Sequence, residues 1–507
     1  MKNIVRSLCL LAIIVSTSVA AEPDSIEDNR PSFILLMGDD HGWEETGYNG
    51  HPDVKTPVLD EMAAVGFRLD RFYSAHPSCS PTRGSVLTGR HPNRYGTFAP
   101  GCSIRPEEVT IAHLLGRAGY RCGHFGKWHV GPVKASSPTN PGAMGFDEWV
   151  SHDNFFELNP PLSHNGKPHT IHEGESSEIV IDETIRFIKK AKSEDKPFLA
   201  VVWFGSPHEP YSGLPKDLAI YDHLPKKYAD RDEVRLTSNE TGRPVKRPLG
   251  EVLRERYAEI TAMDRAIGTL RDYLKEEKLK DNTLVWYCGD NGTPPSGVLA
   301  SPLHGRKGQV YDGGIRVPAV IEWPRGITAP RDSAVNTVTS DMLPTLCGLA
   351  RVAVPDDRVL DGISLVELLE GKIEQRPSPM FFWNFSSWKS LGEPWIDPEL
   401  QKGTTPLVKF LGGQRTRNFS NNHYPAIAET DYRGSRAMVD NRYKLVIHDG
   451  KNDAEPQIEL FDLRADQAEE IDLAETEPAI VTKMWTEMKA WQKSVLTSLT
   501  GADYPKN

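Results

Sequence analysis

Cysteine is scarce in this sequence, which has 6 in 507 residues. Cys9 lies in an N-terminal segment that we expect to be removed, so five remain. Cys288 falls in an apolar strand pattern and Cys347 in a helical pattern, where single buried thiols are common. We therefore expect no disulfide framework, although a single bridge among Cys102, Cys122, Cys288 and Cys347 stays open.

Long apolar runs are missing beyond the N-terminus, where no segment approaches about 18 uninterrupted apolar residues, so we expect no membrane span. At the N-terminus itself, Lys2 and Arg6 precede an apolar run from Leu8 to Val15, and the small residues of Ser18-Val19-Ala20 follow. This pattern predicts a secretory signal peptide over residues 1–21, and hence a secreted or periplasmic protein.

A basic stripe is also absent. The formal net charge is −11, with acidic and basic residues interspersed, so we expect no nucleic-acid partner. Internal repeats, low-complexity tracts and the paired Cys/His spacing of zinc sites are missing as well. These absences favour an acidic, exported enzyme whose length allows a sizeable core.

The fold class follows from strand and helix patterns that alternate along the chain. Helical patterns cover residues 56–65, with Thr56 as the cap, 111–118, and a long stretch from about 253 to 279. Between them, apolar β-rich runs end abruptly in polar loops and predict buried strands: Phe33 to Met37, Tyr120 to Phe125, Phe198 to Phe204 and Thr283 to Cys288. This alternation predicts an α/β fold with a large, doubly wound, mostly parallel sheet.

The pattern changes after about residue 375. Short strands are predicted at residues 380–383, 443–447 and 458–462, followed by a helix at 478–498. We expect a catalytic domain over residues 22–375 and a smaller antiparallel α+β subdomain over residues 376–507. Residues 384–432 show little periodicity, and we interpret them as a long loop or insertion.

Unusual polar residues follow the predicted strands at the points where these strands end. Because the carboxyl ends of strands form the binding crevice of open α/β sheets, four strands should deliver them to one place. The residues are Asp39 and Asp40, Lys127 and His129, His208, and Asp290 and Asn291.

Four of these residues, Asp39, Asp40, Asp290 and Asn291, offer only oxygen ligands. Such a set suits a hard divalent cation, and the number of ligands favours calcium over magnesium. Any one aspartate after a strand could instead be a helix cap or a turn residue. Taken together, the four predict a metal site.

Cationic residues accompany these acids and could hold the oxygens of an anionic ester and the charge that moves to its leaving group. A single lysine near glycine is usually solvated and a single histidine is usually structural, so the set carries the prediction. Its members are Arg83, Lys127, His129, His208 and Lys307.

The most specific motif is the run from Cys79 to Arg90, which reads Cys-x-Pro-x-Arg followed by Leu-Thr-Gly-Arg. It resembles the type I sulfatases, in which this cysteine is oxidised to formylglycine. The resemblance extends along most of the chain through Leu36-Met37-Gly38-Asp39-Asp40, Thr56-Pro57-x-Leu59-Asp60, Gly126-Lys127-Trp128-His129, Ser206-Pro207-His208, Met263-Asp264-Arg265, Gly289-Asp290-Asn291-Gly292, Asp312-Gly313-Gly314-Ile315-Arg316 and Glu459-Leu460-Phe461-Asp462-Leu463. Gly38 and Cys288-Gly289 depart from the residues common in the family, without removing a ligand.

The resemblance implies the fold of the alkaline-phosphatase superfamily, a maturation enzyme that forms formylglycine from Cys79, and a hydrated aldehyde as the nucleophile. It implies one calcium ion bound by matured Cys79, Asp39, Asp40, Asp290 and Asn291. Arg83 would hold the formylglycine, while Lys127 and Lys307 would contact the sulfate. His208, with Lys307, would protonate the leaving alcohol, and His129 would act as a base when sulfate is released.

Two alternatives remain open at this point. A phosphonate or phosphate ester hydrolase of the same superfamily could use a similar cation cluster, although a two-zinc phosphatase would need further His and Asp ligands. A secreted glycan-binding protein that has lost catalysis should lack a ligand or the nucleophile, and none is missing here.

The expected substrate is a sulfated carbohydrate, which the residues do not specify further. Residues 384–432 contain aromatic and cationic side chains that could face a sulfated sugar, and they fit a structural surface loop equally well. These are Trp388, Trp395, Arg415, Arg417, His423 and Tyr424.

Overall fold

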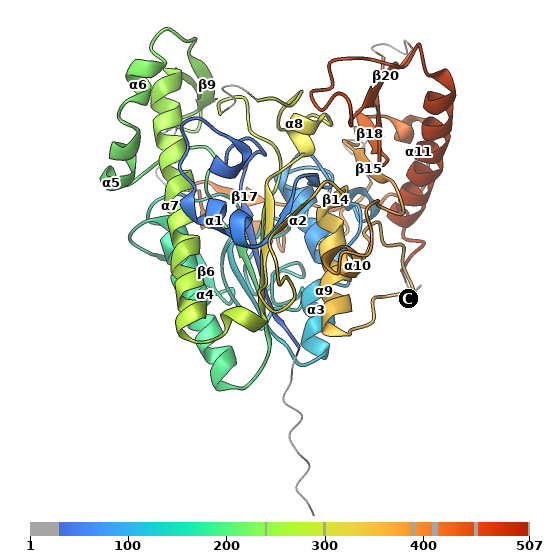
Figure 1. The fold of residues 1–507 in the computed structure, drawn as a ribbon. Helices are drawn as coiled ribbons and strands as arrows, with labels where there is room; N and C mark the ends of the chain where they lie inside the picture. The colour runs from blue at the N-terminus through green and yellow to red at the C-terminus, as the bar shows by residue number, and fades with distance from the viewer. Residues whose placement is uncertain are drawn as a thin grey trace, which may run out of the picture.

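The computed structural model describes residues 30–238, 241–297, 301–386, 392–407, 414–450 and 455–504. The predicted signal peptide, residues 1–21, lies outside the described residues. Two sheets of unequal size organise the chain, and helices pack on both faces of the larger one (Figure 1).

The large sheet has ten strands in the order β13-β2-β12-β11-β1-β8-β4-β5-β6-β7. Its five central strands, from β11 to β5, are parallel, and antiparallel pairings lie toward both edges. The sheet is therefore mostly parallel, as predicted. The strands are β1 (Ser32–Gly38), β2 (Phe67–Leu69), β4 (Arg121–Lys127), β5 (Glu148–His152), β6 (Pro161–His164), β7 (Thr170–Ile171), β8 (Phe198–Trp203), β11 (Thr283–Gly289), β12 (Ala319–Glu322) and β13 (Arg331–Ser333).

Each face of this sheet has its own apolar core, because successive side chains of a strand point to opposite faces. Leu35 and Met37 of β1 join the core beneath α2 (Cys79–Thr88), α3 (Ile111–Arg117) and α9 (Met342–Ala350). Ile34 and Leu36 join the core beneath α1 (Pro57–Val65), α4 (Ser176–Ser193) and α7 (Leu249–Glu276). Both faces of β1 are buried, which explains its continuous apolar sequence.

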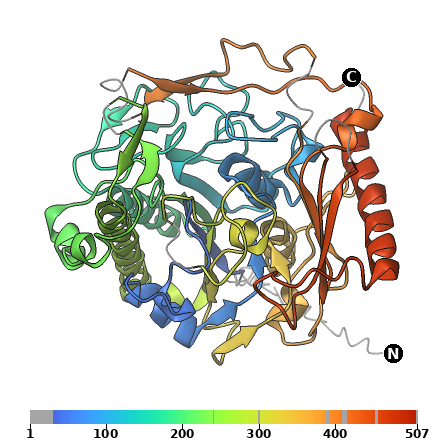
Figure 2. The ribbon, with the colours of Figure 1, turned by 90° about the horizontal axis from the view of Figure 1, so that it is seen from above.

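The small sheet follows in sequence and is antiparallel throughout, in the order β15-β18-β19-β20. Helix α11 (Pro478–Leu499) packs against it at one side of the molecule (Figure 2). The predicted division at residue 375 falls between the two sheets, and as a domain boundary it stays a prediction. The strands are β15 (Met380–Trp383), β18 (Arg436–Val439), β19 (Tyr443–His448) and β20 (Gln457–Asp462).

The region predicted as a loop, residues 384–432, contains a hairpin of β16 (Lys402–Pro406) and β17 (Thr416–Asn418) in its described parts. Figure 2 shows this orange part of the chain reaching away from the small sheet along the edge of the molecule. Its strands are short and polar, so they lack the apolar alternation by which strands are predicted. Trp388 lies outside the described residues.

The remaining elements are short and connect the main ones. Two small sheets pair β9 (Val234–Thr237) with β10 (Pro244–Arg247), and β3 (Phe72–Tyr73) with β14 (Thr337–Val338). The short helices are α5 (Pro215–Leu218), α6 (Leu224–Lys227), α8 (Asp312–Ile315) and α10 (Val366–Leu369).

The cap predicted for α1 differs from the one observed. Thr56 occupies the N-cap position, but its hydroxyl bonds to Asp60 and not to a helix amide. Instead, Asp264 of α7 accepts hydrogen bonds from the amides of Val58 and Leu59, at 2.9 and 2.8 Å. A buried carboxylate from a distant helix therefore satisfies the free amides at the start of α1.

Five cysteines lie in the described part of the chain, and all of them are buried free thiols. A helix with the length and apolar content needed to cross a membrane does not occur among the described residues.

Candidate active site

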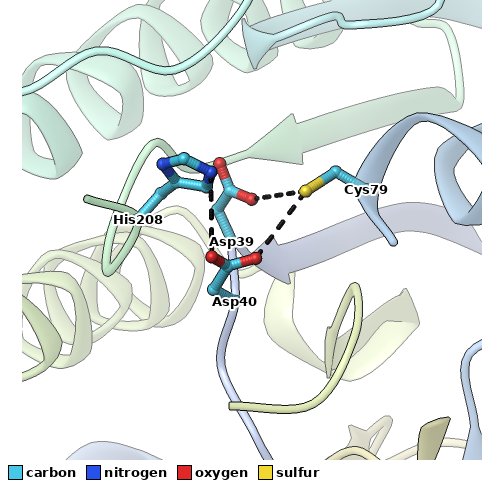
Figure 3. Close-up of side chains that lie close together, drawn as sticks. All are labelled: Asp39, Asp40, Cys79 and His208. Carbon is cyan, nitrogen blue, oxygen red and sulfur yellow. Dashed lines mark hydrogen bonds and ion pairs between the residues drawn. The ribbon is translucent and has the colours of Figure 1, made fainter. Parts of the chain in front are cut away.

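Cys79 is the first residue of α2, and its thiol faces two carboxylates that directly follow β1. The Sγ atom lies 3.4 Å from Asp39 Oδ1 and 3.7 Å from Asp40 Oδ1, with His208 on the far side of Asp40 (Figure 3). The strand ends at Gly38, and Asp40 has a left-handed backbone with a φ of 63°. This uncommon conformation for a non-glycine residue turns the chain sharply at the site.

Arg83 lies one turn further along α2 and faces the end of β11. Its Nη2 atom donates to Asp290 Oδ2 at 2.7 Å and lies 3.5 Å from Asp39 Oδ1, while its Nη1 atom donates to the carbonyl of Lys127. The guanidinium also lies over the ring of Trp203, 5.1 Å from the centroid. Arg83 thus connects the ends of four neighbouring strands, β11, β1, β8 and β4.

Two lysines complete the charge balance around the acids. The Nζ atom of Lys127 lies 2.5 Å from Asp39 Oδ2, and that of Lys307 lies 2.7 Å from Asp40 Oδ2. Burial alone would raise the pKa of Asp40, but Lys307 and His208 hold it well below its usual range. Burial and the nearby Asp39 raise the pKa of Asp290 to about 6.

His129 and His208 both lie near this cluster. His129, with a φ of 58°, is buried, and neither of its ring nitrogens has a hydrogen-bond partner among the described residues. The Nε2 atom of His208 lies 3.7 Å from Asp40 Oδ2, and its ring stacks on Phe155. Burial lowers the pKa of His208 to about 3, and burial with Lys127 lowers that of His129 strongly. The lowered pKa values favour the neutral form of both rings while the site holds no anionic ligand.

The thiol of Cys79 is a weak nucleophile in these surroundings. Burial, followed by the charge of Asp290, raises its pKa well above the usual value, although Lys127 and Lys307 act in the opposite direction. Because only the thiolate is strongly nucleophilic, an unmodified Cys79 would react poorly at neutral pH.

The acids at this site fit a divalent cation. Ligand atoms of Asp39, Asp40, Cys79 and His208 all lie within 4.8 Å of one another. Asn291 donates through its Nδ2 atom to Asp40, and its buried Oδ1 atom has no partner among the described residues. The buried amide oxygen has no hydrogen-bond donor among the described residues and lies next to three carboxylates. Together these oxygens form a set of ligands that suits a calcium ion.

Arg256 of α7 holds two of the loops that carry the site and was not among the residues predicted from the sequence. It is fully buried and donates to the carbonyls of Asp40 and Pro207, and to both carboxylate oxygens of Glu45. A long helical pattern gives no sign that one of its arginines points inward to loops distant in sequence.

All residues predicted from the strand ends and from the Cys79 motif thus lie in one cluster, whereas the described aromatic and cationic residues of the insertion line two separate cavities. Arg415 and Arg417 line a cavity that His208 also lines. Trp395, His423 and Tyr424 line a different, smaller hollow.

Residues 31–352 match the family model described as Sulfatase, and the chain therefore belongs to the sulfatase family. It is an enzyme that hydrolyses sulfate esters. The sulfatase predicted from the sequence is thereby confirmed at the level of the family.

Curated relatives and solved structures agree with this assignment. The chain is 30% identical over 385 residues to the N-acetylgalactosamine-6-sulfatase of Canis lupus familiaris, covering 68% of this chain and 67% of that protein. It is 30% identical over 375 residues to an ulvan-active sulfatase of Formosa agariphila, covering 71% and 70%. Among solved structures, Ps i-CgsB in complex with k-i-k-neocarrahexaose superposes with a TM-score of 0.72 at 22% identity, covering 92% of this chain and 93% of that one.

Proposed function

We propose that this sulfatase removes a sulfate group from a sulfated glycan, with formylglycine formed from Cys79 as the nucleophile and one calcium ion bound beside it. The observation that carries the proposal is the position of Cys79 at the start of α2, between carboxylates and cations. The relatives support a glycan substrate, since one is an N-acetylgalactosamine-6-sulfatase and another is an ulvan-active sulfatase.

The raised pKa of Cys79 supports the modification, because the thiol itself is a poor nucleophile. Once formed, the hydrated aldehyde would supply a geminal diol as the nucleophile, and calcium, when bound, would supply positive charge beside it. Asp39, Asp40, Asp290 and Asn291 would hold the metal through their oxygens, together with matured Cys79.

The cationic residues bind and orient the ester. Arg83 lies on the helix that carries Cys79 and is held by Asp290, and there it would fix the matured side chain. Lys127 and Lys307 flank Asp39 and Asp40 and would contact the oxygens of the sulfate group. Charges placed in advance around a developing anion stabilise it without reorganisation during the reaction.

The two histidines move protons. The Nε2 atom of His208 points into the site and, with Lys307, donates a proton to the oxygen of the leaving alcohol. His129 has both ring nitrogens without partners among the described residues, so it can accept a proton when the bound sulfate is released. An anionic ester bound nearby favours the protonated form of His208, which is the form this role needs.

The proposal includes export of the protein and its maturation by a formylglycine-generating enzyme. The signal-peptide pattern of residues 1–21 and the need to oxidise Cys79 support these two points. N-terminal sequencing of the exported protein should begin at Glu22, and a start at Met1 would contradict export through this segment.

The experiment that tests the function joins peptide mass spectrometry across Cys79 with a phenyl sulfate hydrolysis assay. Maturation should lower the peptide mass by about 18 Da, because a thiol becomes an aldehyde. Cys79→Ala is the control and should show neither the shift nor turnover. If protein from a host that matures known sulfatases keeps Cys79 as a thiol and still releases sulfate, the proposed nucleophile is wrong.

A further inference from the structure

A cavity of ≈ 570 Å³ opens beside the active site and is lined by residues from distant parts of the chain. Asn154 and Phe155 come from the loop after β5, and His208 and Glu209 from the loop after β8. Arg415 to Asn418 come from β17 and the residue before it. Since His208 is part of the catalytic cluster, the bulk of a substrate beyond its sulfate would enter this cavity.

The hairpin that brings these arginines is anchored firmly to the large sheet. The Oδ2 atom of Asp153, just after β5, accepts from the amides of Thr404 and Thr405 at 2.6 and 2.7 Å, and from the Thr405 hydroxyl at 2.7 Å. Directly after the other strand, β17, Phe419 packs against the ring of His129. The anchored hairpin therefore holds Arg417 at a defined position next to the site.

Arg417 lacks the partner that a half-buried arginine usually has. Its Nε atom is buried without a hydrogen-bond partner, and no carboxylate among the described residues forms an ion pair with its guanidinium. Burial lowers its pKa, and the nearby Arg415 adds a like charge. A half-buried cation without a counter-charge is unfavourable, and an anionic ligand would relieve this cost.

The surroundings of Arg417 are shaped to hold its guanidinium. A Cβ atom at Gly101 would approach Arg417 Nη2 to 2.8 Å, so the glycine leaves the space that the guanidinium fills. Arg417 also acts electrostatically on the rings and thiols of the site, since its charge contributes at both His129 and Cys79. It lies beside the catalytic cluster, yet it contacts none of the three acids that Arg83, Lys127 and Lys307 neutralise.

We propose that Arg417, supported by Arg415, binds a second anionic group of the substrate, a carboxylate or a further sulfate, while the sulfate to be cleaved lies at Cys79. This inference rests on the proposed function and adds to it a requirement for two negative charges on the substrate. The planar guanidinium can donate two parallel hydrogen bonds to either group.

The acidic residue of the cavity lies apart from these arginines. The carboxylate of Glu209 is held by the amide and hydroxyl of Thr237, at 3.4 and 3.2 Å, and burial raises its pKa. It is not among the charges that act on Arg417. The cavity thus has a cationic side, where we place the second anionic group, and a side suited to sugar hydroxyls.

The test compares matured wild-type enzyme with Arg417→Gln on small aryl sulfates, with sulfate release followed by ion chromatography. The probes are phenyl sulfate, 2- and 3-carboxyphenyl sulfate, and 1,2- and 1,3-phenylene disulfate. For each probe, the ratio of variant to wild-type kcat/KM cancels differences in the leaving group. We expect Arg417→Gln to lose about 10- to 100-fold in kcat/KM on probes with a second charge, mainly through KM. On phenyl sulfate the change should stay below about threefold.

Two further variants separate charge from structure. Arg417→Lys keeps a point charge without the planar fork and should recover part of the loss. Lys402→Gln removes an exposed cation of the same hairpin that pairs with Glu399, and should change no probe. A selective loss on carboxylate probes or on disulfate probes identifies which of the two anions Arg417 binds.

Three results are decisive against these ideas. If Arg417→Gln loses kcat/KM equally on all probes, Arg417 serves the sulfate being cleaved. If it loses no kcat/KM on any probe with a second charge, Arg417 binds no second anion. Either result overturns the inference. If matured wild-type enzyme hydrolyses none of the probes, the proposed function fails, and the inference falls with it.

Discussion

Arg83 and Asp290 face each other across the active site, with Nη2 of the arginine donating to Oδ2 of the aspartate at 2.7 Å. Both side chains are fully buried. One comes from the first turns of α2 and the other from the end of β11, so the pair connects the helix that carries Cys79 to the central sheet.

Arg83→Met should both destabilise the protein and abolish its activity. The variant leaves Asp290 buried without its partner, and breaking a buried ion pair typically costs about 3–5 kcal/mol. Urea unfolding should show this loss, and the matured variant should release no sulfate. Arg254→Met is a matched control, because Arg254 pairs with Asp222 at the surface. Exposed pairs contribute about 1 kcal/mol or less. Equal stability losses in both variants would contradict the structural role of Arg83.

Calcium should raise the unfolding temperature in a concentration-dependent manner. A ligand that binds only the folded state stabilises it by about 2.7 kcal/mol at a free concentration 100 times its Kd. Asn291→Leu removes the unpartnered amide oxygen and should weaken this response. Thermal unfolding in EGTA, calcium and magnesium measures the effect, with magnesium expected to act less because the ligand number favours calcium. An unfolding temperature that is the same in EGTA and in calcium would rule out the proposed metal.

His91→Gln should reduce the pH dependence of the free energy of unfolding at acidic pH. Burial lowers the pKa of His91 to about 3 in the folded state, while an unfolded histidine titrates near 6.5. Below about pH 6.5 the unfolded chain binds a proton that the folded chain does not, so the free energy of unfolding falls by about 1.4 kcal/mol per pH unit until about pH 3. The contribution is complete above pH 6.5.

Urea unfolding at several pH values between about 4 and 7, the window set by those pKa values, checks this slope. The variant also loses the hydrogen bond from the amide of Asn93 to the His91 ring. This loss lowers the free energy of unfolding by the same amount at every pH and does not change its slope. His169→Gln is the control, since His169 is exposed and its ring stays in contact with water. The prediction fails if both variants keep the wild-type slope.

Asp153→Asn should loosen the hairpin of β16 and β17. One carboxylate oxygen accepts three hydrogen bonds from this hairpin, and the amide nitrogen of asparagine cannot accept any. Hydrogen exchange over residues 402–418 should accelerate, and KM for 3-carboxyphenyl sulfate should rise more than KM for phenyl sulfate. Asp182→Asn, at an exposed position of α4, should leave both quantities unchanged. Unchanged exchange in Asp153→Asn would show that other contacts hold the hairpin.

The sequence predicted the central sheet and the strand-end residues well because these features are local. Leu35 and Ile34 belong to a strand buried on both faces, so the apolar run itself marks β1. Asp39 and Asp40 then follow where the run stops. Because parallel strands end at the same edge of the sheet, the residues that follow them lie close together, and this can be predicted without knowing any contact.

Features that depend on distant partners could not be predicted in this way. Asp264 caps α1 from more than 200 residues away, and the local pattern indicated Thr56 instead. Strand β18 has only four residues and was missed, although it lies between β15 and β19 in the small sheet. Arg417 was one of several candidates in the insertion, and only the fold shows that it shares a cavity with His208.

The burial of Cys79 sets an order of events in the life of the protein. Its side chain lies at the base of α2 and the residue is 1% exposed, so no other enzyme can bring its catalytic groups to this thiol once the sheet and helix have assembled. An enzyme that forms formylglycine from Cys79, as proposed, would therefore have to meet this residue before the chain folds. Under the proposed maturation, folding would close the site to another protein, whereas the sulfate end of a small substrate would still enter it from the cavity beside His208.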